Sequence, residues 1–353
     1  MFLKIVRNDF NRKKIITASV FVFITMAVIL GASATNIIAN LAQSISELKE
    51  RALPADIAQM HAGQYDQSAI DRFTEDQQEH IAMQETMVLL NFEGMNIHYG
   101  DDETMAGTIQ DISFVVQNKK FDFLLDLNNR KLDVKEGEIA VPIYFMVKHD
   151  LKIGDSIRVE TEEYQNKFII SDYVRDYEMN ASIASSKRFV VSQTDFDKIL
   201  EKQTGELEYI IEFRLTENGN AQAVQTAYNE AGLPANGPTV NAMTFMLFNA
   251  MSDLAIAMVI ILISILLIVI SALCIKLTFL ATMDEDLREI GVMKAMGISQ
   301  NDIKKVYLTK YRVMSVAAGV IGYIVSFPVA NLFSGNMRLY LSSNLSGNLK
   351  YGL

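Results

Sequence analysis

Residues Leu254–Ile275 read LAIAMVIILISILLIVISALCI and contain no charged side chain. A helix rises about 1.5 Å per residue, so this run matches a hydrocarbon core roughly 30 Å thick. Two further stretches, Ile15–Ile38 and Val313–Met337, also lack charge. A buried helix of a soluble protein is the alternative for each, but uncharged runs of this length are rare there. The sequence therefore predicts three transmembrane helices, at 15–38, 254–275 and 313–333.

The first of these stretches has a second interpretation, as a secretory signal peptide. A basic segment precedes it, and Ala32-Ser33-Ala34 resembles a cleavage site. However, its apolar run is much longer than the roughly 7–15 residues of a signal sequence. We therefore expect an uncleaved membrane anchor.

The distribution of positive charge predicts how the spans are oriented. Residues 1–14 are basic, and basic segments stay in the cytoplasm. The connector 276–312 is basic too, through Lys276, Arg288, Lys294, Lys304, Lys305, Lys310 and Arg312. We therefore expect 1–14 and 276–312 on the inner side of a cell membrane, and 39–253 and the tail 334–353 on the outer side.

Composition argues against two classes of protein. The 353 residues are 50% hydrophobic and carry a net charge of −10, which argues against general nucleic-acid binding. The single cysteine, Cys274, lies inside the second span, so no internal disulfide can form.

Residues 39–253 are long enough for a domain with its own core. Ala39–Met83 is rich in Gln, Glu, Asp and Ala and is predicted to be helical. Strand-like runs follow at Met87–Phe92, Ile109–Val116, Ile139–Phe145, Ser156–Glu160, Lys167–Tyr173, Arg188–Val191 and Tyr209–Leu215. Two helices are expected among them, at Gln193–Gln203 and Asn220–Ala231. The predicted fold class is a membrane α-helical protein with a large extracytoplasmic α+β domain between its first two spans.

The connector contains Met283–Ser299, which reads MDEDLREIGVMKAMGIS. Asp284–Asp286 predict the N-terminus of a helix, where acidic groups oppose the macrodipole. Gly297 predicts its end, and Gly291 permits close approach of another backbone. An apolar stripe is expected from Leu287, Ile290, Met293 and Met296. Such a helix between two spans is well placed to receive a push from a cytoplasmic partner.

The layout and two motifs resemble the FtsX-like permease family, the MacB-type class of ABC transporter membrane subunits. Arg288–Ser299, REIGVMKAMGIS, is similar to the family segment REIGVLKALGAS. Glu138–Pro142 and Leu151–Ile157, EIAVP and LKIGDSI, are similar to its outer-domain pattern of a strand, a short helix and a second strand. The resemblance is motif-specific over about thirty residues and otherwise concerns the layout.

The resemblance implies that 283–299 is a coupling helix seated against an ATP-hydrolysing subunit. The residues expected to contact that subunit are Leu287, Arg288, Glu289, Ile290, Gly291, Lys294, Ala295 and Gly297. The alternative is an interfacial helix that only joins two spans. The family also has a fourth span, whereas Ser334–Leu353 has no long apolar run. The chain is therefore expected to be truncated, split, or the N-terminal half of a longer permease.

Small residues in the third span predict close helix packing in lipid. They are Ser315, Gly319, Gly322 and Ser326, at spacings of three and four. Packing within the chain and a seam with a second copy both fit this pattern.

No pattern of catalytic, cofactor or metal-binding residues stands out. The sequence has no GxxxxGK[ST] phosphate loop, so ATP hydrolysis is expected on a separate subunit. The histidines His61, His80, His98 and His149 lack metal-site spacing. Asp101-Asp102-Glu103 fits a solvated turn better than a cation site.

These observations, with the resemblance, predict a non-enzymatic permease subunit of an ABC transporter that moves a hydrophobic or peptide client outside the membrane. Expected partners are an ABC ATPase, a second permease copy or half, membrane lipid and the client; no nucleic acid is expected. One alternative is a non-transporting transducer that regulates a cell-wall hydrolase or a sensor. Another is a membrane-anchored binding protein without an ATPase.

Overall fold

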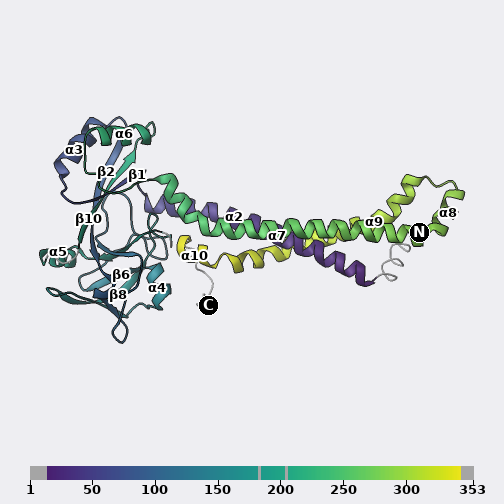
Figure 1. The fold of residues 1–353 in the computed structure, drawn as a ribbon, viewed down its shortest axis with the longest axis horizontal. Coiled ribbons are helices and arrows are strands. Elements are labelled where there is room, and N and C mark those ends of the chain that lie inside the picture. The colour runs from purple at the N-terminus through teal and green to yellow at the C-terminus, as the bar shows by residue number, and fades with distance from the viewer. Residues whose placement is uncertain (1–13, 182–183, 203–205, 343–353) are drawn as a thin grey trace. The chain divides into compact units, whose positions relative to one another are not determined.

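The computed structural model describes residues 14–181, 184–202 and 206–342. It divides into two compact units (Figure 1). The helical unit comprises the described residues up to Leu41 together with Ser252–Gly335, and the sheet unit comprises Ala42–Met251 and the described residues from Asn336 onward. The expected basic N-terminal segment falls almost entirely on residues 1–13 and so lies outside the described residues, as do residues 343–353 of the tail.

Four helices account for the helical unit: α2 (Lys14–Ala52), α7 (Ala242–Glu285), α8 (Leu287–Ala295) and α9 (Gln300–Phe333). The segments Thr17–Ala52, Ala242–Glu285 and Gln300–Phe333 are long and apolar enough to cross a membrane. Helices α2, α7 and α9 each contain one of the three predicted spans and extend beyond it, because helical backbone continues through polar sequence until a breaking residue or a cap. The side of the membrane on which each end lies stays a prediction.

Small side chains bring α2, α7 and α9 together within the helical unit. Ala34, Ile37, Ala257, Ile260 and Ala330 form its buried apolar cluster. The Ser33 hydroxyl donates to the carbonyl oxygen of Ser326 at 3.0 Å, and the Ser264 hydroxyl donates to that of Ala27 at 2.9 Å. Helices in lipid associate through such close packing and interhelical hydrogen bonds, since apolar burial against lipid drives little association.

The sheet unit contains one sheet of eleven described strands, in the order β11-β1-β10-β2-β5-β9-β6-β8-β7-β3-β4. The strands are β1 (Ile57–Ala62), β2 (Ile81–Phe92), β3 (Ile97–Tyr99), β4 (Glu103–Thr104), β5 (Asp111–Val115), β6 (Glu138–Pro142), β7 (Ser156–Glu160), β8 (Gln165–Val174), β9 (Ser186–Val191), β10 (Glu206–Leu215) and β11 (Thr239–Asn241). Pairs β5–β9 and β6–β8 are parallel, and the other pairs are antiparallel.

Helices cover this sheet over two separate cores. The remaining helices are α3 (Gln67–Asp76), the 3-10 turn η1 (Gly94–Asn96), α4 (Ile143–His149), α5 (Gln193–Glu201), α6 (Ala221–Glu230) and α10 (Gly335–Leu341). Helices α3 and α6 lie near β1 and β2 (Figure 1). They bury Phe73 and Tyr228 against Phe213 of β10. The larger core lies over β5 to β9 and includes Phe114, Phe189 and residues of α4 and α5.

Most predicted strands and both predicted short helices are confirmed, and side-chain caps explain the helix starts. Ser192 accepts from the Asp195 N–H at the start of α5, and Asn220 accepts from the Ala223 N–H at the start of α6. The structure therefore supports a membrane-helix fold with a large, sheet-rich domain.

Two sequence predictions were wrong. Ala39–Met83 is helical only to Ala52 and again over α3, because Pro54 follows and the intervening apolar runs pair as β1 and β2. Ile143, Tyr144 and Phe145 belong to α4 and not to the preceding strand, since Pro142 ends β6. The short strands β3, β4 and β11 had no predicted counterpart.

The contact between α9 and α2 at Gly322 generates a prediction. A Cβ at this position would lie 2.8 Å from Val28 Cβ and 3.0 Å from the Thr25 carbonyl oxygen. We expect Gly322→Leu to overpack the helices and destabilise the helical unit by about 1–3 kcal/mol. The measurement is thermal unfolding of the chain purified in detergent. Gly319→Leu is the matched control, because a Cβ there meets no described atom within 4 Å; equal losses from both variants would contradict the packing.

Candidate functional site

The connector between α7 and α9 is shorter as a helix than the predicted range 283–299. Asp284 and Glu285 end α7, and Asp286 occupies the position before α8 without a side-chain capping hydrogen bond. The expectation that all three acids open a helix was therefore wrong, because α7 continues without a break beyond its apolar run. The predicted coupling segment corresponds to α8 followed by a turn into α9.

Gly297 ends α8, as its sequence position predicts. Its φ is +84°, and its N–H donates to the Lys294 carbonyl at 3.0 Å while the Ile298 N–H donates to that of Met293 at 3.1 Å. This pair of bonds is the Schellman arrangement, in which glycine adopts the left-handed conformation without strain. Ser299 then caps α9 by accepting from the Asp302 N–H.

Most of the residues proposed to contact an ATPase are exposed. Leu287 is 64% exposed, whereas Ile290 is only 6% exposed. The expected apolar stripe is therefore split, with Leu287 and Met296 at the surface and Ile290 buried. The remaining exposed members of the predicted set are Arg288, Gly291, Lys294, Ala295 and Gly297. The side chain of Glu289 lies outside the described residues.

The predicted small-residue set of α9 divides into two pairs. Gly322 and Ser326 are buried against α2, as described above, so they serve packing within the chain. Ser315 is exposed and lines a cavity of about 440 Å³ between α2 and α7, with Gly31 and Ser271 among its other residues. No described atom lies within 4 Å of a Cβ at Gly319.

Within the sheet unit, one segment after β8 hydrogen-bonds to α10, to the start of α7 and to the loop that follows α2. This joint segment, Arg175–Asn180, reads RDYEMN. Arg175 is fully buried and donates from Nη2 to the Leu339 carbonyl of α10 at 2.7 Å. Asn180 donates from Nδ2 to the Tyr340 carbonyl at 2.5 Å. The last turn of α10 is therefore satisfied by side chains of the joint segment.

The same joint segment contacts the start of α7 and the loop that follows α2. The Tyr177 carbonyl accepts from Asn249 Nδ2 at 2.6 Å, and Glu178 Oε1 accepts from the Ala55 N–H at 2.9 Å. Two residues further back, the Leu53 carbonyl accepts from the Asp122 N–H at 2.8 Å. The six consecutive residues of the joint segment thus bond to α7, to α10 and to the loop that follows α2.

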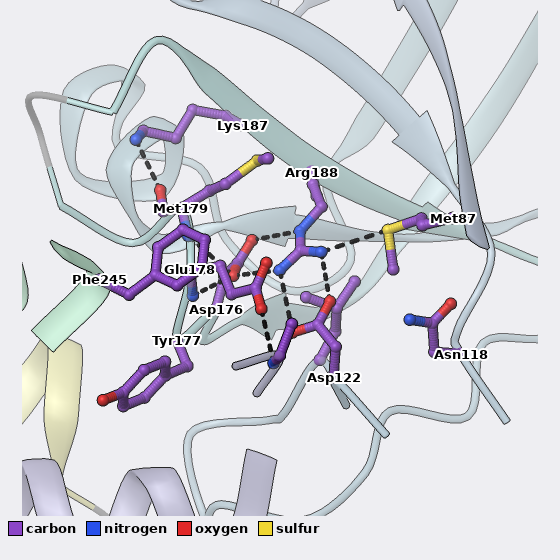
Figure 2. A network of polar contacts seen from close by, with 12 residues as sticks. Met87, Asn118, Asp122, Asp176, Tyr177, Glu178, Met179, Lys187, Arg188 and Phe245 are labelled. Atoms are coloured by element: carbon purple, nitrogen blue, oxygen red, sulfur yellow. Dashed lines mark hydrogen bonds and ion pairs between the residues drawn. The ribbon is translucent and has the colours of Figure 1, made fainter. Parts of the chain in front are cut away.

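A buried ion-pair group fixes the joint segment to the sheet. Figure 2 shows Arg188 of β9 between Asp122 and Asp176. Arg188 donates from Nε to Asp176 Oδ2 at 2.6 Å and from Nη1 to Asp122 Oδ2 at 2.5 Å. Burial acts to raise the pKa of Asp176, but Arg188 and two backbone N–H donors outweigh it, so this pKa lies below its usual value.

Lys187 supports the segment from the other side. Its Nζ donates to the carbonyl oxygens of Met179 and Ala181, each at 2.7 Å. Burial lowers the pKa of Lys187 to about 8. The ammonium is therefore held by backbone carbonyls at neutral pH.

The joint segment and the buried ion pairs carry no recognisable sequence motif. The feature of the sequence that could have indicated buried ion pairs is the presence of two charged dipeptides, Arg175-Asp176 and Lys187-Arg188, beside apolar strand residues. Asp102, which we expected in a solvated turn, is exposed there and pairs with Arg158.

Comparisons with known proteins point to one family. Residues 261–350 match the model of the FtsX-like permease C-terminal region. The chain is 25% identical over 204 residues to the ABC transporter permease YtrF of Bacillus subtilis (strain 168), across 57% of this chain and 44% of that protein. The match thus spans less than half the length of this relative. A solved domain of a permease protein from Porphyromonas gingivalis aligns over 49% of this chain and 70% of its own, at 12% identity and a TM-score of 0.29, and carries no argument about the fold.

The Arg188 group generates a prediction about stability. Arg188→Met leaves buried carboxylates without their cation, so we expect the sheet unit to lose about 3–5 kcal/mol of unfolding free energy. The measurement is denaturant unfolding of the chain in detergent, followed by circular dichroism. Lys152→Met is the control: Lys152 pairs with Asp150 at 3.2 Å at the surface, where an ion pair contributes only about 0–1 kcal/mol. Similar losses for both variants would contradict a special role for the buried group.

Proposed function

We propose that this chain is a member of the FtsX-like permease family and the membrane subunit of an ABC transporter, because residues 261–350 match the family's C-terminal model and an ABC transporter permease is 25% identical over 204 residues. A separate ATPase binds and hydrolyses ATP, since the sequence has no phosphate loop of its own. The chain itself converts the motion of that ATPase into movement outside the membrane.

The ATPase docks on α8 in this proposal. Exposed apolar groups beside charge, at Leu287, Val292, Arg288 and Lys294, suit a protein surface better than the membrane interior. Gly291 leaves open space for a partner backbone, because a Cβ there meets no described atom within 4 Å. The Schellman turn at Gly297 joins α8 rigidly to α9, so a push on one reaches the other.

The observation that carries the proposal is the convergence of three helical elements on Arg175–Asn180. The loop that follows α2, the start of α7 and the last turn of α10 all hydrogen-bond to this one segment. A shift of any of these elements is therefore felt by the buried ion pairs that join the segment to β9. Interactions of this kind suit transmission of force, because buried hydrogen-bonded pairs have little freedom to adjust.

The proposed membrane topology follows the distribution of positive charge along the chain. Residues 1–14 and the connector face the cytoplasm, and the sheet unit lies outside the cell membrane. There it moves or releases a hydrophobic or peptide client, which need not pass between the spans. A second permease copy or half completes the transporter, and lipid contacts the many exposed apolar residues of α7 and α9.

Replacement of Gly291 by tryptophan tests the docking surface. We expect Gly291→Trp to reduce co-purification of the cognate ABC ATPase from membranes at least ten-fold, because the indole occupies the space intended for the partner. Gly319→Trp is the matched control, since Gly319 is also a helical glycine with open space around it. The measurement is the ATPase-to-permease ratio after affinity purification.

Either of two results would contradict the proposal. An ATPase that binds both variants equally well would make α8 a simple connector. An absence of any ATPase beside the native chain would favour a membrane-anchored binding protein instead.

A further inference from the structure

Four carboxyl groups surround one guanidinium inside the sheet unit. Arg188, Asp122, Asp176, Glu178 and Glu212 are all at most 4% exposed. With every acid ionised, the group would carry four negative charges against one positive charge. Uncompensated charges are not tolerated in a region of low dielectric constant. Some of these acids must therefore be neutral or neutralised.

The two aspartates bind all three nitrogens of the guanidinium, and Nη1 also donates to Met87 Sδ at 3.3 Å. Asp176 accepts from Nε and Nη2 of Arg188 and also from the N–H groups of Glu178 and Met179, each at 2.9 Å. Asp122 accepts from Nη1 at 2.5 Å and from Nη2 at 3.4 Å. These are the interactions of ionised carboxylates.

The two glutamates are placed differently. Glu178 Oε1 accepts from the Ala55 N–H, and Glu212 Oε2 accepts from Asn118 Nδ2 at 2.9 Å. The other oxygen of each, Glu178 Oε2 and Glu212 Oε1, has no hydrogen-bond partner among the described residues. Glu212 Oε1 is 3.9 Å from Arg188 Nη1, too far for a hydrogen bond. Each glutamate thus has one satisfied acceptor and one oxygen available to carry a proton.

We propose that Glu178 and Glu212 form a buried proton-binding site that holds two protons at neutral pH, one on each side chain. Oxygens of Asp122, Glu178 and Glu212 lie within 4.8 Å of one another. Ionised carboxylates this close repel, and protonation removes the repulsion. Two protons reduce the net charge of the group from three negative charges to one.

The direction of the pKa shifts agrees with this site. Burial raises the pKa of both glutamates well above the usual value, and the charge of Asp122 raises each further. Burial also raises the pKa of Asp122, although Arg188 opposes that shift.

A divalent cation would fit the oxygen spacing but not the charges around it. Arg188 Nη1 is already 2.5 Å from Asp122 Oδ2 and 3.9 Å from Glu212 Oε1. A metal ion among these oxygens would face the guanidinium at short range, whereas protons neutralise the glutamates without adding a second cation.

Proton release would loosen the loop that follows α2. Glu178 holds Ala55, which lies between α2 and β1. Ionised Glu178 would be driven from the group towards water and would release the Ala55 N–H. The joint is therefore firm at neutral or acidic external pH and loosens at alkaline pH, and this inference does not depend on the proposed ATPase.

Neighbouring ionisable groups set the pH range of the test. Above about pH 8, unfolded Lys187 binds a proton that the folded state lacks, so this lysine makes stability rise with pH and opposes the glutamates. Burial raises the pKa of Tyr177 to about 12, outside the range. Ordinary histidines are mostly neutral above about pH 7. From about pH 7 to about pH 8 folded Lys187 loses at most about half a proton, so the glutamates, with two protons, dominate the pH dependence in this range.

The experiment is reversible denaturant unfolding of the full chain in detergent across that range. Unfolded glutamates have a pKa near about 4.3 and release both protons, so the folded state binds two more protons than the unfolded state. Stability then falls as pH rises, and the unfolding equilibrium constant increases about a hundred-fold per pH unit. We expect about ten-fold per unit for Glu178→Gln or Glu212→Gln, and for the double variant only the small opposite change, about two-fold, that Lys187 contributes. Glu163→Gln, at an exposed position, keeps the native slope.

Three results would contradict the proposed proton-binding site. They are a native chain without this pH dependence, a slope that the two glutamine variants leave unchanged, and stabilisation of the native chain by calcium or magnesium that chelator removes and both variants lose. If the variants do not fold, infrared spectroscopy of the native chain decides. A carbonyl band of buried carboxylic acid at about pH 7 supports the site, and its absence overturns it.

Discussion

The guanidinium of Arg188 is the interaction on which the sheet unit depends most. It lies on β9, whose neighbours in the sheet are β5 and β6, and it binds Asp122 and Asp176 at once. Asp122 connects through its backbone N–H to the Leu53 carbonyl after α2, and Asp176 accepts the N–H groups that shape the turn at Glu178. A single buried cation thus fixes both segments that hold the helix ends, and the cost of leaving its partners unpaired keeps it in place.

That arrangement places four buried carboxyl groups around one guanidinium beside the joint segment. Asp122 and Asp176 use the directional donors of Arg188, so Glu178 and Glu212 need another source of neutrality. Fully satisfied buried polar networks rigidify a core, whereas partly satisfied ones weaken it. How firmly the joint segment is held therefore depends on the charge state of Glu178 and Glu212.

The helical unit solves a different problem with different chemistry. Lipid offers no apolar driving force for helix association, so α9 approaches α2 through Gly322 and Ser326. The bulky side chains of α7 stay mostly exposed. At the connector the chain presents α8, whose exposed apolar and charged groups suit a protein partner. Residues of α9 thus provide the packing within the helical unit, and residues of α8 provide the exposed surface.

The sequence by itself determined the three apolar helices, most strands of the sheet and the end of α8 at Gly297, because each rests on local patterns of charge, alternation and backbone freedom. It could not determine that Ala39–Met83 contains β1 and β2, since strand pairing with β10 comes from residues far along the chain. Nor could it separate Gly322 and Ser326 from Ser315 and Gly319, which share the same spacing. Only the tertiary structure brought Arg175–Asn180, Asp122, Arg188 and Glu212 together. Buried ion pairs form between segments that no sequence period relates, so their partners are decided by the fold.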